Sequence, residues 1–341
     1  MKKIKKALPA LLLSLGYMGL AFACRSQACV FLILAGLSAA ALLNNKKNRF
    51  IGVISDLLIL AFVLPMGASV VLYEASFFRR ETTPEALQQK LPETIHMVAS
   101  PFASNFGQQL CGRLYYYGDE VPDTVVLISH GNGVGQKGYT SIIDFFAVNN
   151  YAVFAYDATG YDESQGFTTR GLPQGIIDLD YAIRHVQQDP LTAGKSIVLF
   201  GHSWGAYSTC AVLNIHPDVE AVIALAGFDH SLQMIEARGR QLVGDVITVL
   251  LPYFCLYERV KFGEYATYTA LDGFANCSAR IMIVHSTDDA TVPIQDGLAL
   301  YQSRYNDNPR FLFVQYSDKG HEGLFAMSEA QQYLVFLRNQ T

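Results

Sequence analysis

A five-residue segment, Gly201-His202-Ser203-Trp204-Gly205, constrains the fold of this chain most strongly. It follows the apolar run 196–200, which is typical of a buried strand, and precedes the helix-like stretch 206–215. A turn between a strand and a helix that approach this closely strains its central residue and accepts only small flanking residues. The segment therefore predicts that the Ser203 hydroxyl stands exposed at the carboxyl end of a sheet.

Strands and helices alternate along the chain from residue 124 onward. Continuous apolar strands that alternate with helices indicate a largely parallel sheet covered on both faces, which is an α/β fold. Two antiparallel strands, at 94–99 and 109–117, are expected before this pattern begins. The expected strands are 124–129, 152–157, 196–200, 221–225, 281–285 and 311–315, and the expected helices are 139–149, 172–188, 206–215, 294–304 and 323–338.

Three further segments carry residues that could act together with Ser203: a loop before it in the chain, and then an aspartate and a histidine after it. The strand at 124–129 runs into His130-Gly131-Asn132-Gly133, a loop of the HG type. Asp289 lies in the loop after the strand at 281–285, and His321 lies after the last strand. Serine, then aspartate, then histidine is the order of the catalytic triad in α/β-hydrolases. Residues 94–341 therefore resemble the α/β-hydrolase superfamily, in the branch that contains serine aminopeptidase-like and monoacylglycerol-lipase-like enzymes.

The resemblance implies a mostly parallel eight-stranded sheet and a role for each motif residue. Ser203 would be the nucleophile, and His321 would act as the general base and then as the general acid. Asp289 would orient His321 and stabilise its charged form. The backbone N–H groups of Asn132 and Trp204 would bind the oxyanion.

Two other acidic residues compete with Asp289 for the third position. Asp288 precedes it directly, and Asp229 follows the strand at 221–225, from which some relatives take their acid. The family spacing H-x-x-x-D-x-x-V-P, which begins here at His285, places the acid at Asp289.

Composition argues against nucleic acids, metals and cofactors. The chain carries a formal charge of −5, and its lysines and arginines form no basic face. Its eight histidines show no paired ligand pattern, so no metal or other cofactor is expected. The six cysteines have neither metal-ligand spacing nor the density of a disulfide scaffold, although Cys255 and Cys277 could meet.

The first 80 residues are predicted to be a transmembrane region with two or three apolar spans, at 7–23, 28–43 and 50–73. The third span would extend over roughly 36 Å, enough to cross a bilayer with tilt. The first two are shorter and could form a tight hairpin. Lysines before the first stretch and Ala21-Phe22-Ala23 at its end also fit a cleaved signal peptide.

Positive charge predicts which side of the membrane the remaining chain occupies. The amino-terminal lysines and the cluster Lys46-Lys47-Asn48-Arg49 should both stay cytoplasmic, so the third span would lead outward. The catalytic domain is then expected to be extracytoplasmic, although Arg79 and Arg80 oppose this orientation. A linker at 81–93 would join the anchor to the catalytic domain at 94–341.

The segment at about 229–277 is too long for a simple crossover and predicts a small helical cap. Its apolar residues could line an acyl pocket or pack the cap onto the sheet. Together these features favour a membrane-anchored serine hydrolase that cleaves esters or thioesters, with a small or lipid-like acyl substrate and the bilayer as partners. A peptidase or amidase of the serine aminopeptidase type and an inactive membrane-tethered binding module are the alternatives. The oligomeric state stays open.

Overall fold

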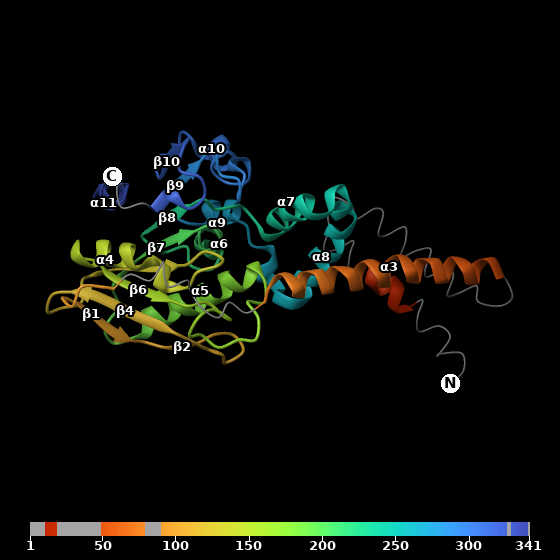
Figure 1. The fold of residues 1–341 in the computed structure, drawn as a ribbon, viewed down its shortest axis with the longest axis horizontal. Coiled ribbons are helices and arrows are strands. Elements are labelled where there is room, and N and C mark those ends of the chain that lie inside the picture. Colours follow the sequence, from red (N-terminus) through yellow and green to blue (C-terminus); the bar gives the residue numbers. More distant parts are fainter. Residues whose placement is uncertain (1–10, 19–48, 79–89, 326–328, 340–341) are drawn as a thin grey trace. The chain divides into compact units, whose positions relative to one another are not determined.

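The structure, a computed structural model, describes residues 11–18, 49–78, 90–325 and 329–339 (Figure 1). Its internal contacts divide the chain into two compact units. The first consists of the described residues of Met1–Ser76 together with Ile235–Ala266, and the second of Phe77–Met234 and the described residues of Thr267–Thr341. The central part of the expected cap is thus grouped with the amino-terminal helices rather than with the rest of the catalytic domain.

The second unit is built on an eight-stranded sheet in the order β1-β4-β6-β5-β7-β8-β9-β10. β4 runs antiparallel to β1 and β6, and all other neighbours are parallel, which confirms the expected mostly parallel sheet. A separate hairpin pairs β2 (Phe102–Ala103) with β3 (Gln109–Leu110). The sheet strands are β1 (Ile95–Ala99), β4 (Gly112–Tyr117), β5 (Thr124–Ser129), β6 (Ala152–Tyr156), β7 (Ser196–His202), β8 (Ala221–Leu225), β9 (Arg280–Ser286) and β10 (Phe311–Tyr316).

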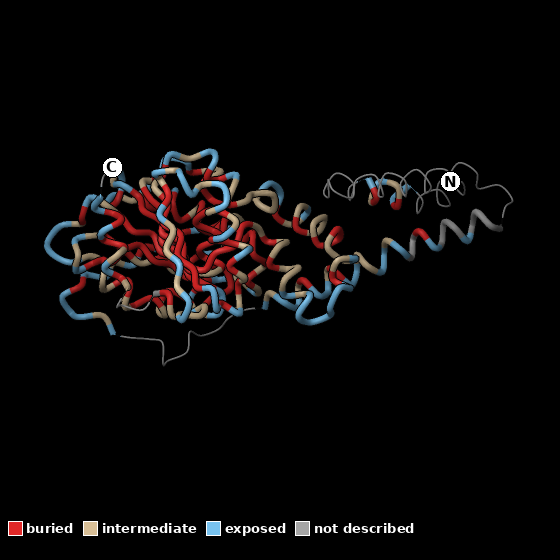
Figure 2. Tube along the Cα trace, turned by 90° about the horizontal axis from the view of Figure 1, so that it is seen from above, coloured by how far each residue is buried: buried red, intermediate tan, exposed pale blue. Residues whose placement is uncertain are grey.

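Helices cover both faces of this sheet, so β6 and β8 are buried along their whole length (Figure 2). On one face Phe146 of α4 stacks on Tyr333 of α11 at 6.5 Å between ring centroids. On the other face α5, α6 and α9 pack side by side, and Tyr301 of α10 contacts Phe274 of α9. These helices are α4 (Thr140–Val148), α5 (Leu172–Gln188), α6 (Trp204–Ala211), α9 (Ala270–Asn276), α10 (Leu298–Tyr305) and α11 (Gln331–Arg338).

The first unit is helical. The long helix α3 (Arg49–Ser76) contains the expected third span, and residues 11–18 form a helix whose Tyr17 donates a hydrogen bond to the carbonyl of Leu58 at 3.0 Å. Most of the first expected span, the whole second span and most of the linker lie outside the described residues. The unit is completed by residues from α7 (Ser231–Val243) and by α8 (Ile247–Phe262).

One described helical stretch, Ser231–Asn276, is long and apolar enough to cross a membrane, and Ala61–Ser76 is a shorter apolar helix. The longer stretch is interrupted at Gly244 and Gly263, where φ is 62° and 61°. At about 1.5 Å per residue, α7 and α8 are each shorter than the roughly 30 Å of a hydrocarbon core. Of the described cysteines, Cys255 and Cys277 are both free, so they form no disulfide.

Candidate active site

Ser203 occupies a strained turn between the end of β7 and the start of α6. Its φ of 55° and ψ of −117° lie in a region that residues other than glycine seldom adopt. A Cβ on Gly205 would lie 1.9 Å from the carbonyl oxygen of Ser129, and one on Gly201 would lie 2.4 Å from the carbonyl oxygen of Gly205. The two glycines are therefore required by the close approach of strand and helix, and the strain at Ser203 is held by the surrounding sheet.

His321 is paired with Asp289 beside this turn. The ring Nδ1 of His321 lies 2.7 Å from Oδ2 of Asp289, whose other oxygen accepts hydrogen bonds from the N–H groups of Thr291 and Val292 at 2.8 and 2.9 Å. Burial by itself would raise the pKa of Asp289, but hydrogen bonds from His285, His321 and Val292 outweigh it and hold this pKa well below its usual range. Asp289 is thus a permanently charged partner for the imidazole.

The two competing acids are engaged elsewhere. The carboxylate of Asp288 accepts hydrogen bonds from the Ser286 hydroxyl and, at 2.9 Å, from the N–H of Gly320. Asp229 instead accepts a hydrogen bond from the N–H of Leu271 at 2.9 Å, at the start of α9. The structure therefore brings Asp289, and neither alternative, to His321.

Two buried tyrosines hold the loop at 130–133. The Tyr139 hydroxyl accepts a hydrogen bond from the N–H of Gly131 at 2.8 Å, and the Tyr161 hydroxyl donates to the side-chain oxygen of Asn132. Within the described residues, no hydrogen bond engages the backbone N–H of Asn132 or of Trp204. Both N–H groups expected to bind an oxyanion are therefore unoccupied donors.

His202 connects the serine turn to the histidine loop. Its Nε2 donates a hydrogen bond to the backbone oxygen of His321 at 2.9 Å, and the two imidazole centroids are 4.8 Å apart. Among the described residues, Ser203 Oγ makes no hydrogen bond to His321. Hydrogen bonds between catalytic groups are often long or misaligned when no substrate is bound. The absence of this bond is therefore consistent with a role for Ser203 and His321 as a pair.

A model of the family described as "Serine aminopeptidase, S33" matches residues 120–270. A Pyrococcus furiosus esterase structure aligns with a TM-score of 0.57 and 17% identity, covering 76% of this chain and 98% of the esterase. The acetyl xylan esterase from Paenibacillus sp. R4 aligns with a TM-score of 0.56 and 18% identity, covering 80% of this chain and 92% of that one. The chain has the α/β-hydrolase fold.

A peptidase also shares this hydrolase fold. The acylaminoacyl peptidase of Pyrococcus horikoshii aligns with a TM-score of 0.55 and 18% identity, covering 73% of this chain but 41% of the longer peptidase. No curated protein sequence matches the chain. Proteins with this fold therefore include esterases as well as a peptidase.

A second histidine, whose role the sequence analysis missed, contacts the carboxylate of Asp289. The Nε2 of His285 donates to the carbonyl of Val292 at 3.0 Å and lies 3.2 Å from Oδ2 of Asp289. Both side chains are fully buried, and Nδ1 of His285 has no hydrogen-bond partner among the residues that the structure describes. His285 and His321 thus contact the same carboxylate oxygen of Asp289. The four-residue spacing between His285 and Asp289 in the H-x-x-x-D pattern was the sequence signal that could have predicted this contact.

We expect replacement of His285 by leucine to lower kcat about 10- to 100-fold, because one hydrogen bond to a charged group contributes about 1.5–3 kcal/mol. The His285→Gln variant keeps a side-chain N–H near the position of Nε2 and should recover most of that loss. Steady-state kinetics of both variants provide the measurement. Equal activity of the two variants would show that the hydrogen bond to Asp289 does not matter.

Two buried histidines near the site should make the stability of the fold depend on pH. Burial lowers the pKa of His130 to about 4 and that of His202 to about 3, against about 6.5 in an unfolded chain. Between the folded and the unfolded pKa values, the unfolded chain therefore binds more protons than the folded protein. The free energy of unfolding has its full value above about pH 6.5 and falls as the pH drops toward 4.

This loss can be followed with the buried Trp204, because the chain contains one tryptophan. We expect the unfolding midpoint, measured by Trp204 fluorescence, to fall between pH 7 and pH 4. A His202→Gln variant should show a smaller slope, since it lacks one of the groups that must be kept neutral. Identical slopes in the two proteins would contradict this assignment.

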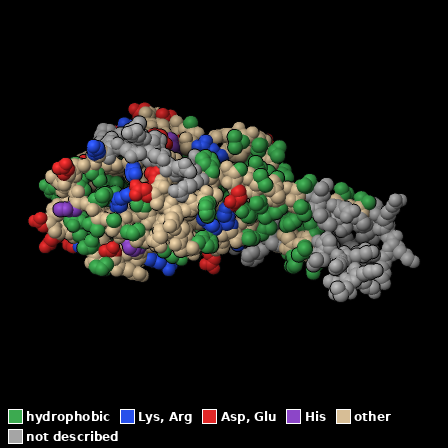
Figure 3. Space-filling view, turned by 60° about the horizontal axis from the view of Figure 1, so that its bottom comes forward, with side chains coloured by type: hydrophobic (Ala, Val, Ile, Leu, Met, Phe, Trp, Pro, Cys, Tyr) green, Lys and Arg blue, Asp and Glu red, His purple; other side chains and the backbone are tan. Residues whose placement is uncertain are grey.

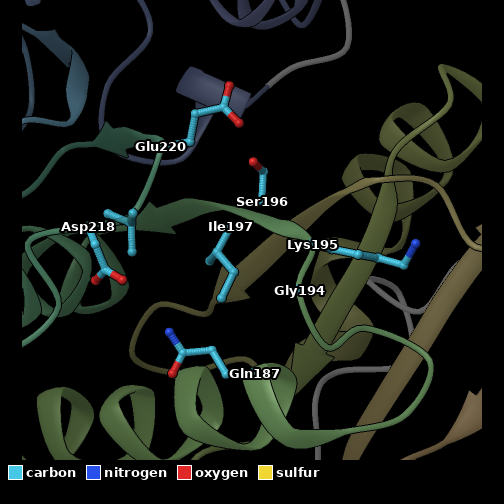
Figure 4. A pocket seen from close by; sticks show the side chains of 8 residues that line it. Gln187, Gly194, Lys195, Ser196, Ile197, Asp218 and Glu220 are labelled. Atoms are coloured by element: carbon cyan, nitrogen blue, oxygen red, sulfur yellow. The ribbon is translucent and has the colours of Figure 1, made fainter.

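A cavity of about 310 Å³ lies at the other end of β7, away from Ser203 (Figure 4). Lys195, Ser196, Asp218 and Glu220 are among the residues that line it. In α/β sheets ligands bind beyond the carboxyl ends of the strands, whereas this cavity is at the amino end of β7. It is therefore separate from the site around Ser203. Among the described residues no group of histidine, cysteine, aspartate and glutamate side chains could hold a metal ion.

Proposed function

We propose that the protein is a membrane-anchored serine hydrolase that cleaves a carboxylic ester or thioester through an acyl-enzyme on Ser203. The observation that carries this proposal is the hydrogen-bonded pair of His321 and Asp289 beside a serine held in a strained turn. A structural serine needs neither this strain nor a nearby histidine that is paired with a carboxylate. The same arrangement activates the serine in unrelated hydrolases.

The reaction proceeds in two halves. Ser203 Oγ attacks the carbonyl carbon while His321 Nε2 takes the hydroxyl proton, and the alcohol or thiol then leaves with that proton. Water attacks the resulting acyl ester in the same way, which releases the acid and restores Ser203. Asp289 remains ionised throughout, and its short hydrogen bond to Nδ1 keeps the reactive nitrogen of His321 directed at the site.

Two backbone N–H groups stabilise the negative oxygen that forms in each half. Trp204 offers its N–H at the start of α6, where the helix dipole also favours negative charge. Asn132 offers the second N–H from the loop that Tyr139 and Tyr161 hold in place. Loss of one such donor typically costs about 10²–10³ in kcat.

A peptidase of the serine aminopeptidase type is the second candidate, because the matching family model carries that description. Two of the similar structures reported above are esterases and one is an acylaminoacyl peptidase, so fold similarity does not separate the two activities. We favour esters because the first unit exposes apolar helices and a membrane location brings acyl lipids to the enzyme. Peptide binding would also need acidic residues for a substrate amine, and the sequence shows no such cluster.

The choice can be tested by comparing p-nitrophenyl esters from acetyl to palmitoyl with aminoacyl anilides. We expect the purified full-length protein to hydrolyse the esters with the higher kcat/KM, and this activity to disappear in the Ser203→Ala variant. A preference for anilides that also depends on Ser203 would establish the peptidase instead.

We also propose that α3 anchors the protein and that the catalytic domain is extracytoplasmic. The apolar sequence of α3 and the positive cluster before it support this orientation. Alkaline phosphatase fused after residue 90 should then be active. An inactive fusion there, with an active one after residue 47, would reverse the orientation.

A further inference from the structure

Helix α8 of the expected cap lies along α3 within the first unit. The Tyr253 hydroxyl donates a hydrogen bond to the carbonyl of Ala61 at 2.9 Å, and the Tyr73 hydroxyl donates to Oε1 of Glu258 at 2.7 Å. Residue numbers in the two helices increase in the same direction along this contact, so α3 and α8 run parallel. Whatever medium surrounds α3 over these residues also surrounds the outer side of α8.

Polar side chains gather at one end of this helix pair. Glu74 of α3 forms an ion pair with Lys261 and accepts a hydrogen bond from the Tyr257 hydroxyl at 2.6 Å. Close to them, Glu258 is buried against Tyr73. Tyrosine and lysine are typical of the boundary between hydrocarbon and water. The carboxyl ends of α3 and α8 therefore have the composition of a membrane interface.

Between Val53 and Leu72, the described side chains of α3 that are exposed are apolar. Exposed large apolar side chains occur from Val53 to Leu72, a distance of about 28 Å along a helix. This length is close to the roughly 30 Å thickness of a bilayer's hydrocarbon core. The exposed apolar residues between these two positions are Leu57, Val63, Leu64 and Val71.

Helix α8 also has exposed apolar side chains, and Figure 3 shows that hydrophobic side chains gather on part of the molecular surface. Residues 246–257 contain no charged side chain. Val249 and Val260 are 64% and 75% exposed, and their separation of eleven residues places them on one side of the helix. Before α8, three further apolar residues, Leu242, Val243 and Val246, are also exposed. A contiguous apolar surface of this kind marks a contact site rather than a water-facing one.

We propose that α8 and the turn before it contact the hydrocarbon of the bilayer beside α3. The partner of this surface is thus the membrane itself rather than a second protein, because one apolar surface joins both helices and their polar residues gather at one end.

This inference rests on the membrane anchor in the proposed function and adds a consequence for the substrate. Residues 235–266 are inserted between β8 and β9, and β8 ends at the same edge of the sheet as Ser203. The chain therefore passes from that edge into a lipid-facing helix and returns. A substrate whose acyl chain is already in the bilayer, such as a membrane lipid ester, fits this arrangement.

Tryptophan quenching by brominated phospholipids tests the contact, because the natural chain has one tryptophan, the buried Trp204. The full-length Val249→Trp variant would be reconstituted in nanodiscs with and without brominated acyl chains. Val335→Trp is the matched control, since Val335 is a 52% exposed helical valine of the second unit. Leu57→Trp in α3 reports on the anchor separately. We expect the emission added at residues 249 and 57 to be mostly lost in brominated lipid, and that at residue 335 to be retained.

Each outcome decides a different point. Quenching at residue 57 without quenching at residue 249 would overturn the lipid contact of α8 and leave the anchor intact. Absence of quenching at both positions would overturn the anchor as well. Equal quenching at residue 335 would show that the contact is not specific to α8, which also overturns the inference. Val260→Trp provides a second position on α8 if Val249→Trp does not fold.

Discussion

Replacing Ser203 by alanine is expected to abolish ester hydrolysis and labelling by a fluorophosphonate probe, with kcat falling by about 10⁶-fold as in other serine hydrolases. The probe reacts only with a serine whose proton is accepted by a nearby base. Ser203 is the residue in the strained turn, and in the proposed mechanism its hydroxyl is the atom that bonds to the acyl group. Labelling of membranes from cells that express each variant is the measurement.

Ser208 provides the control, because it lies one turn further along α6 and its hydroxyl donates to the carbonyl of Trp204 at 2.9 Å. The Ser208→Ala variant should be labelled like the natural protein. Labelling that persists in Ser203→Ala would remove Ser203 as the nucleophile. Absence of labelling in the natural protein, with the fold intact, would instead favour the inactive binding module.

Replacing Asp289 by asparagine is expected to lower kcat about 10⁴-fold, the loss seen when a triad carboxylate becomes an amide. An amide can donate as well as accept, so it can hold His321 in the tautomer that has no free base at Nε2. The amide also has no charge to stabilise the imidazolium. Steady-state kinetics with the best ester substrate would measure the loss.

The neighbouring Asp288→Asn variant is the matched control. Asp288 accepts a hydrogen bond from the N–H of Gly320, and an amide oxygen can still accept it. Its kcat should therefore stay within about tenfold of the natural value. A larger loss in Asp288→Asn than in Asp289→Asn would exchange the two assignments.

Local sequence patterns predicted the sheet well, because each buried strand is a continuous apolar run between turns. The bounds of β5, β8 and α5 coincide with the expected ones. At the catalytic turn, β7 extends through His202 and α6 begins at Trp204, so strand and helix are separated by Ser203 alone. The sequence pattern does not predict so short a separation. The glycines that permit the tight turn also have low strand and helix propensity, so the predicted strand ends too early and the predicted helix begins too late.

The supporting residues of the site were much harder to predict. His202, Tyr139 and Tyr161 act through hydrogen bonds to residues from 8 to 119 positions away, and no local periodicity records such partners. His285 was recognised only as the first residue of a motif. Its second contact, with a carboxylate that also holds His321, exists only when the loop after β9 meets the loop after β10.

The sequence by itself determined the order of strands and helices, the strained serine turn and the residues of the expected triad, because these follow from local periodicity, glycine spacing and motif order. Only the tertiary structure showed the contact between Asp289 and His321 that the motif spacing had predicted, since adjacent carboxylates differ by the direction in which a folded loop points them. It also decided that α8 packs with α3 in one unit. An apolar helix has the same sequence signature whether it covers an active site or another helix, and the difference lies in its neighbours.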